Sequence, residues 1–114
     1  MSPGTEPAVA APVFAALGDP TRLGLVATLA DGQPRSVSEL SEGRPISRQA
    51  VTKHLHVLEA AGVVGSLRAG RETRFALVPD RIASARDYLD DVGRQWEAAL
   101  GRLKGFVEGQ PPSR

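Results

Sequence analysis

The chain has no cysteine among its 114 residues, which excludes disulfides, thiolate metal ligands and cysteine nucleophiles. A chain without cysteine fits a protein of the cytoplasm. The sequence also lacks any apolar run approaching the roughly 20 residues that a membrane-spanning helix needs, so no membrane partner is predicted. Residues 1–11, rich in proline and alanine and without the basic start of a signal peptide, are expected to form a flexible tail, as are residues 109–114.

Histidine is almost as scarce. The two present, His54 and His56, lie two positions apart and therefore on different faces of a helix. We find no nucleophile–base pair, phosphate-binding loop or metal-ligand constellation, so the sequence does not predict an enzyme. Asp87, Asp90 and Asp91 form a local acidic group, for which a solvated helix face is a better interpretation than a magnesium or calcium site. No metal and no other cofactor is predicted.

The net charge is only +1 and identifies no partner, but its distribution is uneven. Residues 44–74 carry six cations and two anions. By contrast, residues 1–43 carry two arginines against five acids, and residues 75–114 balance at six against six. A polyanionic partner would therefore meet the middle third of the chain. Because an arginine-rich composition also produces such an excess by chance, the placement of these cations decides its meaning.

Start and stop signals divide the chain into short elements. Asp19 before Pro20, and Ser36 with Glu39 as a capping box, mark two helix starts, and Ser47 caps a third helix. A glycine at position 62 ends that helix, and another at position 70 suits a tight turn between two strands. The predicted elements are helices within 12–17, 19–32, 36–42 and 47–61, strands at 63–67 and 73–78, and a helix at 80–108.

This order predicts a mainly α domain with a small β-hairpin: a winged helix-turn-helix of about five helices and a two-stranded wing, spanning residues 12–108. In the helix 47–61, Val51, Leu55 and Leu58 recur at helical spacing and predict a buried face. The opposite face carries side chains that can reach base edges and phosphates in a major groove, namely Arg48, Gln49, Thr52, Lys53 and His56.

The stretches ALGDPTRLGLVATL, SVSEL and ISRQAVTKHLHVLEAAGVVGSLRAGRETRFAL resemble the ArsR/SmtB family of bacterial winged-helix transcriptional repressors. The resemblance covers residues 12–78 by motif and the last helix by position. It implies a homodimer that binds operator DNA, usually represses its own operon and is released by an inducer. The base-reading positions that it implies are Arg48, Gln49, Thr52 and Lys53. The positions expected at the DNA backbone are Ser47, His54, His56, Arg68, Arg71 and Arg74. For His54, which lies beside the buried Leu55, support of the helix is the alternative.

The metal sites of this family have no counterpart in the sequence. Where many members carry a Cys-x-Cys pair, Leu40 is followed by Ser41 and Glu42. Others bind zinc through histidines of the last helix, but here residues 80–108 contain none. The chain therefore resembles the metal-independent branch of the family. Its inducer stays open between an unknown small organic molecule at the dimer seam, a rare ion on carboxylates, and none at all.

The helix 80–108 carries apolar residues at alternating spacings of three and four, an unbroken seam of the coiled-coil kind. A small domain cannot cover so long a seam alone, so we predict a homodimer; packing on the chain's own first helices is the alternative. Trp96, the only tryptophan, is expected to be a core or interface anchor, with a ligand pocket around it as the lesser alternative. The predicted dimer interface consists of Ile82, Ala85, Leu89, Val92, Trp96, Ala99, Leu103 and Phe106.

Together these features predict a sequence-specific regulator of transcription that binds double-stranded DNA. Its operator would be an inverted repeat, contacted through the helix 47–61 and the wing 63–78. Repression, including repression of its own gene, is implied by the family resemblance. The competing interpretation is a winged helix that contacts other proteins without specific DNA binding. Apolar residues on the exposed face of the helix 47–61 would favour that alternative, and the residues present there do not.

Overall fold

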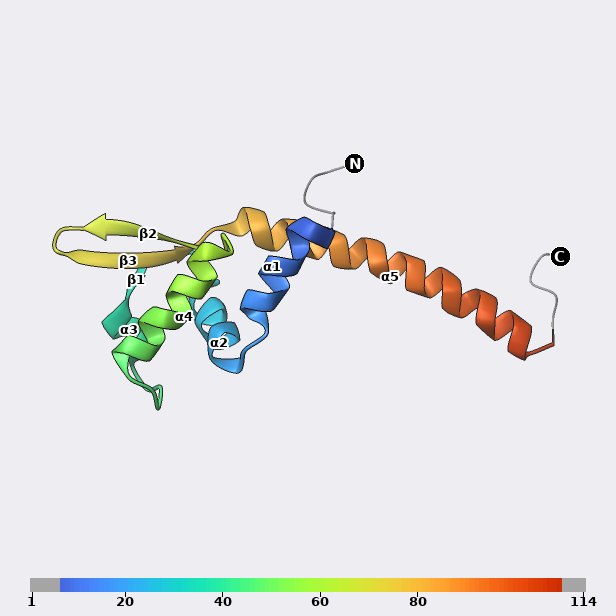
Figure 1. Cartoon of the computed structure of the whole chain (residues 1–114), viewed down its shortest axis with the longest axis horizontal. Coiled ribbons are helices and arrows are strands. Elements are labelled where there is room, and N and C mark those ends of the chain that lie inside the picture. Colours follow the sequence, from blue (N-terminus) through green and yellow to red (C-terminus); the bar gives the residue numbers. More distant parts are fainter. Residues whose placement is uncertain (1–6, 110–114) are drawn as a thin grey trace.

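The computed structural model describes residues 7–109 as five helices and a three-stranded antiparallel sheet. Helices α1 to α4 form the body, the β-hairpin extends from one side, and the last helix leaves on the other (Figure 1). Residues 1–6 and 110–114, which make up most of the two expected tails, lie outside the described part. The elements are α1 (Pro7–Leu17), α2 (Pro20–Leu29), β1 (Arg35–Ser36), α3 (Val37–Ser41), α4 (Arg48–Ala60), β2 (Val64–Ala69), β3 (Glu72–Leu77) and α5 (Pro79–Val107).

The caps read from the sequence form as predicted. The Asp19 carboxylate accepts a hydrogen bond from the Arg22 backbone N–H at 3.0 Å, which caps α2. Ser36 and Glu39 exchange hydrogen bonds in a complete capping box at the start of α3. The Ser47 hydroxyl accepts from the Ala50 N–H at 3.1 Å and caps α4. These side chains satisfy backbone donors that a helix start otherwise leaves without a partner.

Helix α4 ends in a turn that only glycine fits. Gly62 has φ of 78°, and the backbone N–H of Val63 reaches back to the Leu58 carbonyl at 2.9 Å. This pattern is the Schellman motif. A Cβ at Gly62 would also lie 2.9 Å from Cγ of Arg81 on α5. The Arg81 side chain of α5 therefore lies over the end of α4, and the positive φ of Gly62 is what favours glycine there.

Helix α1 begins earlier than the sequence predicts. It starts at Pro7 rather than Pro12, so part of the expected N-terminal tail is helical. Proline is common at the first position of a helix because it lacks a backbone N–H donor, so the sequence favoured Pro12 as the start of this helix. In the structure Pro12 lies inside α1, and the preceding turn is held by packing, with Ala10 only 1% exposed.

The sheet has the strand order β1-β3-β2, with both pairings antiparallel. Strands β2 and β3 form the predicted wing, with Val64 opposite Leu77 and Ala69 opposite Glu72. The short strand β1 adds a third member by pairing Ser36 with Arg74. Two residues give too little alternation for a strand to be recognised from sequence, which explains why the wing was predicted with two strands.

One hydrophobic core joins all four body helices to the wing and to the start of α5. The predicted buried face of α4 is confirmed, because Val51, Leu55 and Leu58 are all 0% exposed. Phe75 of β3 and Ala85 of α5 are also buried in this core, which fixes the wing and α5 relative to α4. The remaining buried members of the core are Val13, Ala16, Leu25, Leu29, Leu40, Val63 and Val64.

Helix α5 makes the molecule long. The principal extents are 68 × 32 × 22 Å and the radius of gyration is 19.3 Å, whereas a compact chain of this length has about 13 Å. Near its start α5 packs on the body, where Tyr88 lies against Phe14 of α1 with ring centroids 6.1 Å apart. Beyond that point it projects away from the body (Figure 1). No helix within residues 7–109 is both long and apolar enough to cross a bilayer.

Candidate nucleic-acid interface

Helix α4 presents a polar face to solvent while its other face is fixed in the core. Ser47, Arg48, Gln49, Lys53 and His56 are exposed. Thr52, on the same side, is partly exposed. Because one face is buried completely, the orientation of the other face is set by packing. A helix held in this way can present long polar side chains to a groove without moving itself.

The turn before α4 is held by an arginine. Gly43 in that turn adopts φ of 74°. The Arg44 guanidinium then turns back, with Nε donating to the Leu40 carbonyl at 2.8 Å and Nη2 donating to Thr28 Oγ1 at 3.1 Å. Its Nη1 lies so close to Gly24 that a Cβ there would come within 2.9 Å. Arg44, one of the six cations of the basic segment, thus joins α2 to α3 and stabilises the turn.

His54, for which the sequence left support of the helix and contact with the DNA backbone as alternatives, turns toward the body. Its side chain is 25% exposed, and Nδ1 lies 3.1 Å from an Arg22 guanidinium nitrogen. Arg22 also donates through Nε to the Ala16 carbonyl, at the end of α1. The Asp19 carboxylate lies 3.9 Å from His54 Nδ1. This cluster connects the end of α1, the start of α2 and the middle of α4.

The same cluster lowers the pKa of Asp19. The hydrogen bond from the Arg22 backbone N–H is the main cause, and the nearby charge of Arg22 acts in the same direction. An ionised Asp19 is the form that caps α2, so the helix start and the charge of this residue support each other.

The wing carries two exposed cations close to its tip. Arg68 lies near the end of β2, and Arg71 follows Gly70, whose φ of 66° makes the tight turn predicted from the sequence. Both side chains are exposed. Within residues 7–109, Arg68 and Arg71 make no side-chain hydrogen bond or ion pair, and the same holds for Arg48 and Lys53 of α4.

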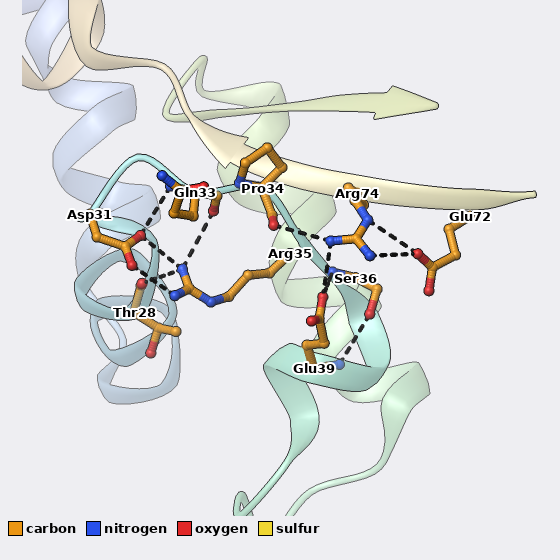
Figure 2. A network of polar contacts seen from close by, with 9 residues as sticks. All are labelled: Thr28, Asp31, Gln33, Pro34, Arg35, Ser36, Glu39, Glu72 and Arg74. Atoms are coloured by element: carbon orange, nitrogen blue, oxygen red, sulfur yellow. Dashed lines mark hydrogen bonds and ion pairs between the residues drawn. The ribbon is translucent and has the colours of Figure 1, made fainter. Parts of the chain in front are cut away.

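Arg74, the third arginine predicted for the wing, differs from these two because carboxylates of its own chain engage it. Its guanidinium contacts Glu72 of the same strand and Glu39 of α3 (Figure 2). The six cations of residues 44–74 therefore divide into two groups. Arg48, Lys53, Arg68 and Arg71 are available to a partner within the described part of the chain, while Arg44 and Arg74 hold neighbouring elements together.

A second arginine in Figure 2 secures the loop between α2 and β1. Arg35 donates to both oxygens of Asp31, at 2.9 and 2.7 Å, and to the carbonyl of Thr28 at 2.9 Å. The hydrogen bonds between Arg35 and the Asp31 carboxylate lower the pKa of Asp31 and raise that of Arg35. The bond to the Thr28 carbonyl supplies a donor at the end of α2, where helix carbonyls otherwise lack one, and the bidentate pair with Asp31 holds Arg35 in that position.

Sequence reasoning did not identify the side-chain pairs that these arginines form. The spacing of four between Asp31 and Arg35 is a recognisable signal for an ion pair. By contrast, Arg22 meets His54 across 32 positions and Arg74 meets Glu39 across 35, and no pattern in a single sequence marks such pairs.

The predicted dimer seam divides into two parts. Ala85 is only 4% exposed in the core of its own chain, so the prediction of an interface at that residue needs correction. Ile82 is partly buried and packs against the same core. From Leu89 onward the large apolar side chains are mostly exposed, with Trp96 at 63% and Phe106 at 73%. Val92 and Ala99 are partly exposed. The other exposed apolar members of this half of α5 are Leu100, Leu103 and Val107.

The described residues contain no group of three or more histidine, aspartate or glutamate side chains placed to hold a metal ion. What they do contain is a helix-turn-helix formed by α3 and α4, a wing formed by β2 and β3, and unpaired cations on both. Such a fold and surface define a winged helix-turn-helix protein of the DNA-binding class.

Comparisons with known proteins agree with this class. Residues 17–65 match a family model described as a helix-turn-helix domain. The HTH-type transcriptional regulator Rv2034 of Mycobacterium tuberculosis is 42% identical over 95 residues, covering 83% of this chain and 85% of that protein. The HTH-type transcriptional repressor SmtB of the same species is 36% identical over 85 residues, covering 75% of this chain and 61% of the repressor.

Among solved structures, an ArsR-like transcriptional regulator from Rhodococcus sp. RHA1 is similar with a TM-score of 0.73 and 37% identity, covering 87% of this chain and 92% of that one. The chain belongs to the ArsR/SmtB family of winged helix-turn-helix transcriptional regulators. It is a DNA-binding regulator of transcription and not an enzyme.

Proposed function

We propose that this protein is a homodimeric repressor that binds an inverted-repeat operator and controls its own gene. The observation that carries the proposal is α4, with one face fully buried and an opposite face of exposed, unpaired polar side chains. Two related proteins are named as repressors: SmtB of Mycobacterium tuberculosis and a probable mercury resistance operon repressor of Streptomyces lividans. A regulator of this kind acts in the bacterial cytoplasm, where the chromosome lies.

Base reading is assigned to the first two turns of α4. Gln49 would recognise adenine through two hydrogen bonds, and Arg48 or Lys53 would recognise guanine, each pair being worth about 1–3 kcal/mol of discrimination. Thr52 completes this set. Ser47 and His56 at the edges of the same face, with Arg68 and Arg71 of the wing, would contact phosphates, which position the protein without carrying sequence information.

The homodimer is supported by the exposed apolar half of α5. A row of exposed side chains from Leu89 to Val107 is a surface that a monomer rarely keeps. The distribution of charge along α5 supports an antiparallel arrangement of the two α5 helices. Residues 79–92 of α5 carry four acids and two arginines, whereas residues 93–107 carry three cations and one acid. An antiparallel pair of α5 helices, related by a two-fold axis, would place the acidic half of each helix against the basic half of the other.

The two-fold axis has a consequence for the operator. Two α4 helices would enter successive major grooves about 34 Å apart, so the operator should be an imperfect inverted repeat.

Release of the repressor is proposed not to depend on the metal sites of the family. The chain has no cysteine, and residues 80–108 have no histidine, so the usual ligands of those sites are missing. An unidentified small-molecule inducer remains compatible with this proposal.

The test is fluorescence anisotropy at physiological salt, with labelled DNA from immediately upstream of the gene and scrambled DNA as competitor. Tight binding that resists the competitor is the expected result. The variants Gln49→Ala and Arg71→Ala then separate the two assigned roles. Gln49→Ala should change the preferred sequence, whereas Arg71→Ala should weaken binding to all sequences alike and flatten its dependence on salt.

The reverse pattern would overturn the assignment of roles. Weak binding that the competitor abolishes, both upstream of the gene and in a selection from random sequences, would overturn specific DNA binding itself. A winged helix that contacts other proteins would then be the better account.

A further inference from the structure

Arg74 occupies a different environment from the two exposed arginines of the wing. Its side chain is 32% exposed and lies between β3 and α3. Nε and Nη2 donate to the same oxygen of Glu72, at 3.1 and 2.9 Å. Nη1 lies 3.4 Å from the Pro34 carbonyl and 3.4 Å from Oε1 of Glu39 (Figure 2). Thus one guanidinium contacts the wing, the loop before β1 and the first helix of the helix-turn-helix.

Glu39 is shared between the helix start and the wing. The same Oε1 that faces Arg74 accepts the Ser36 backbone N–H at 2.9 Å and so completes the capping box of α3. That hydrogen bond is the main reason the pKa of Glu39 is lowered, and the charge of Arg74 adds to it. Ser36 itself pairs with Arg74 across the sheet. The start of α3 and the root of the wing therefore meet at a single carboxylate.

The backbone gives this junction little support of its own. Strand β1 contributes only two residues to its pairing with β3, and an isolated two-stranded hairpin is marginally stable in water. Side chains must therefore contribute to the angle at which the hairpin leaves the body. Phe75 anchors one face of β3 in the core, and Arg74 holds the other face against α3.

We propose that Arg74 is a positioning residue for DNA binding, which acts through Glu39 to hold the wing at a fixed orientation relative to α4. This proposal rests on the DNA-binding function proposed above. The alternative role for Arg74 is a direct contact with a DNA phosphate. Such a contact would withdraw the guanidinium from the Glu39 and Glu72 carboxylates. Glu39 and Glu72 would then face the phosphates without a cation between them, which is unfavourable. The exposed Arg68 and Arg71 are free to make the phosphate contacts.

Four variants to glutamine test this role: Glu39→Gln and Glu72→Gln, which remove a charge at nearly constant size, and Arg74→Gln and Arg71→Gln, which replace a guanidinium with a shorter neutral side chain. Glutamine at position 39 retains an oxygen that can accept the Ser36 N–H, so the start of α3 is preserved. Glu72 lies in the wing itself and cannot join the wing to α3, so Glu72→Gln is the control for removal of one acid. Arg71→Gln is the comparison for loss of a phosphate contact.

The decisive measurement is operator affinity as a function of salt concentration. Each lost phosphate contact reduces the slope of log K against log salt by about 0.9, or about 1.8 for a dimer in which both copies are changed. Arg71→Gln should show this reduction. Arg74→Gln should bind about fivefold more weakly, a typical coupling between side chains in contact, with the slope unchanged.

Glu39→Gln gives the sharper contrast, because removing an acid near DNA should by charge alone tighten binding. A positioning role predicts weaker binding instead, again about fivefold. Glu72→Gln should bind as tightly as the unchanged protein or more tightly. The proposal is overturned if Arg74→Gln reduces the slope as Arg71→Gln does, or if Glu39→Gln binds as tightly as the unchanged protein or more tightly.

A second measurement does not depend on DNA. Residual dipolar couplings of backbone amides in the free protein report the orientation of the wing relative to α4. In the unchanged protein both should fit one alignment tensor, whereas in Arg74→Gln and Glu39→Gln the wing should depart from it. A wing that stays aligned in both variants overturns the proposal. If the unchanged protein binds no operator, the proposed function fails, while these couplings still decide whether Arg74 orients the wing.

Discussion

Leu103 and Leu23 form a matched pair with which to test the dimer. They are the same residue type with nearly equal exposure, 55% on α5 and 52% on α2. Only Leu103 belongs to the proposed interface. Complete burial of a leucine is worth about 1.5–3 kcal/mol, so covering the exposed half of Leu103 would contribute about 1–1.5 kcal/mol per copy. Two copies give about 2–3 kcal/mol, or roughly 30- to 150-fold in the dissociation constant of the dimer.

Sedimentation equilibrium of Leu103→Ala and Leu23→Ala measures this difference directly. Alanine is the best helix former, so neither change weakens its helix. We expect Leu103→Ala to raise the dissociation constant by that factor and Leu23→Ala to leave it nearly unchanged. Equal effects of the two substitutions, or no effect of either, would refute the assignment of α5 as the interface.

Trp96 supplies an independent report from the same surface. It is the only tryptophan of the chain, and 63% of it is exposed in the monomer. Its emission should therefore shift to shorter wavelength as the protein concentration rises through the dissociation constant. In Leu103→Ala that shift should move to higher concentration. Emission typical of water-exposed indole, from a protein that sediments as a dimer, would show that the partner covers another surface.

Three further predictions concern the body of the domain. Leu55→Ala should lower the free energy of unfolding by about 2–5 kcal/mol in chemical denaturation, because Leu55 is 0% exposed and its loss leaves a cavity. Ser36→Ala should lower it by about 1 kcal/mol, through loss of the cap of α3. Because hydrogen bonds from Arg35 lower the pKa of Asp31 in the folded chain, the pair stabilises the fold above the ordinary pKa of 3.8 and loses this effect as the pH falls below it. Denaturation from pH 6 to pH 2 should thus show Asp31→Asn less stable than the unchanged protein at pH 6, with the difference shrinking toward pH 2.

Most of the fold could be predicted from local signals. Caps and turns act within four or five residues, so Asp19, Ser36, Ser47 and Gly62 placed the ends of the helices correctly. The spacing of apolar residues likewise identified the buried face of α4. Strand β1 could not be found in this way, because its two residues form a strand only when β3 lies beside them.

The candidate site was predictable by residue type but not by role. Six cations in one segment indicated a surface for a polyanion, yet Arg44 and Arg74 turn inward to partners on other elements. Likewise His54 turns toward Arg22, although its neighbour His56 is exposed. A side chain on a short helix or strand lies within reach of partners far away in sequence, and a single sequence does not record which of them it meets.

Helix α5 shows the same limit for apolar residues. A seam spaced by three and four residues indicates that one face must be covered, but it does not identify what covers it. In the structure Ala85 is covered by the chain's own core, and seven residues further on the same seam Val92 is still partly exposed. The change from covered to exposed lies where α5 passes beyond α1, since Tyr88 is the residue that meets Phe14. The length of α1 therefore determines how much of the seam is left for a partner. Leu103 lies well beyond that point, so the effect of Leu103→Ala on dimer dissociation should come from contacts with the partner and not from contacts within the chain.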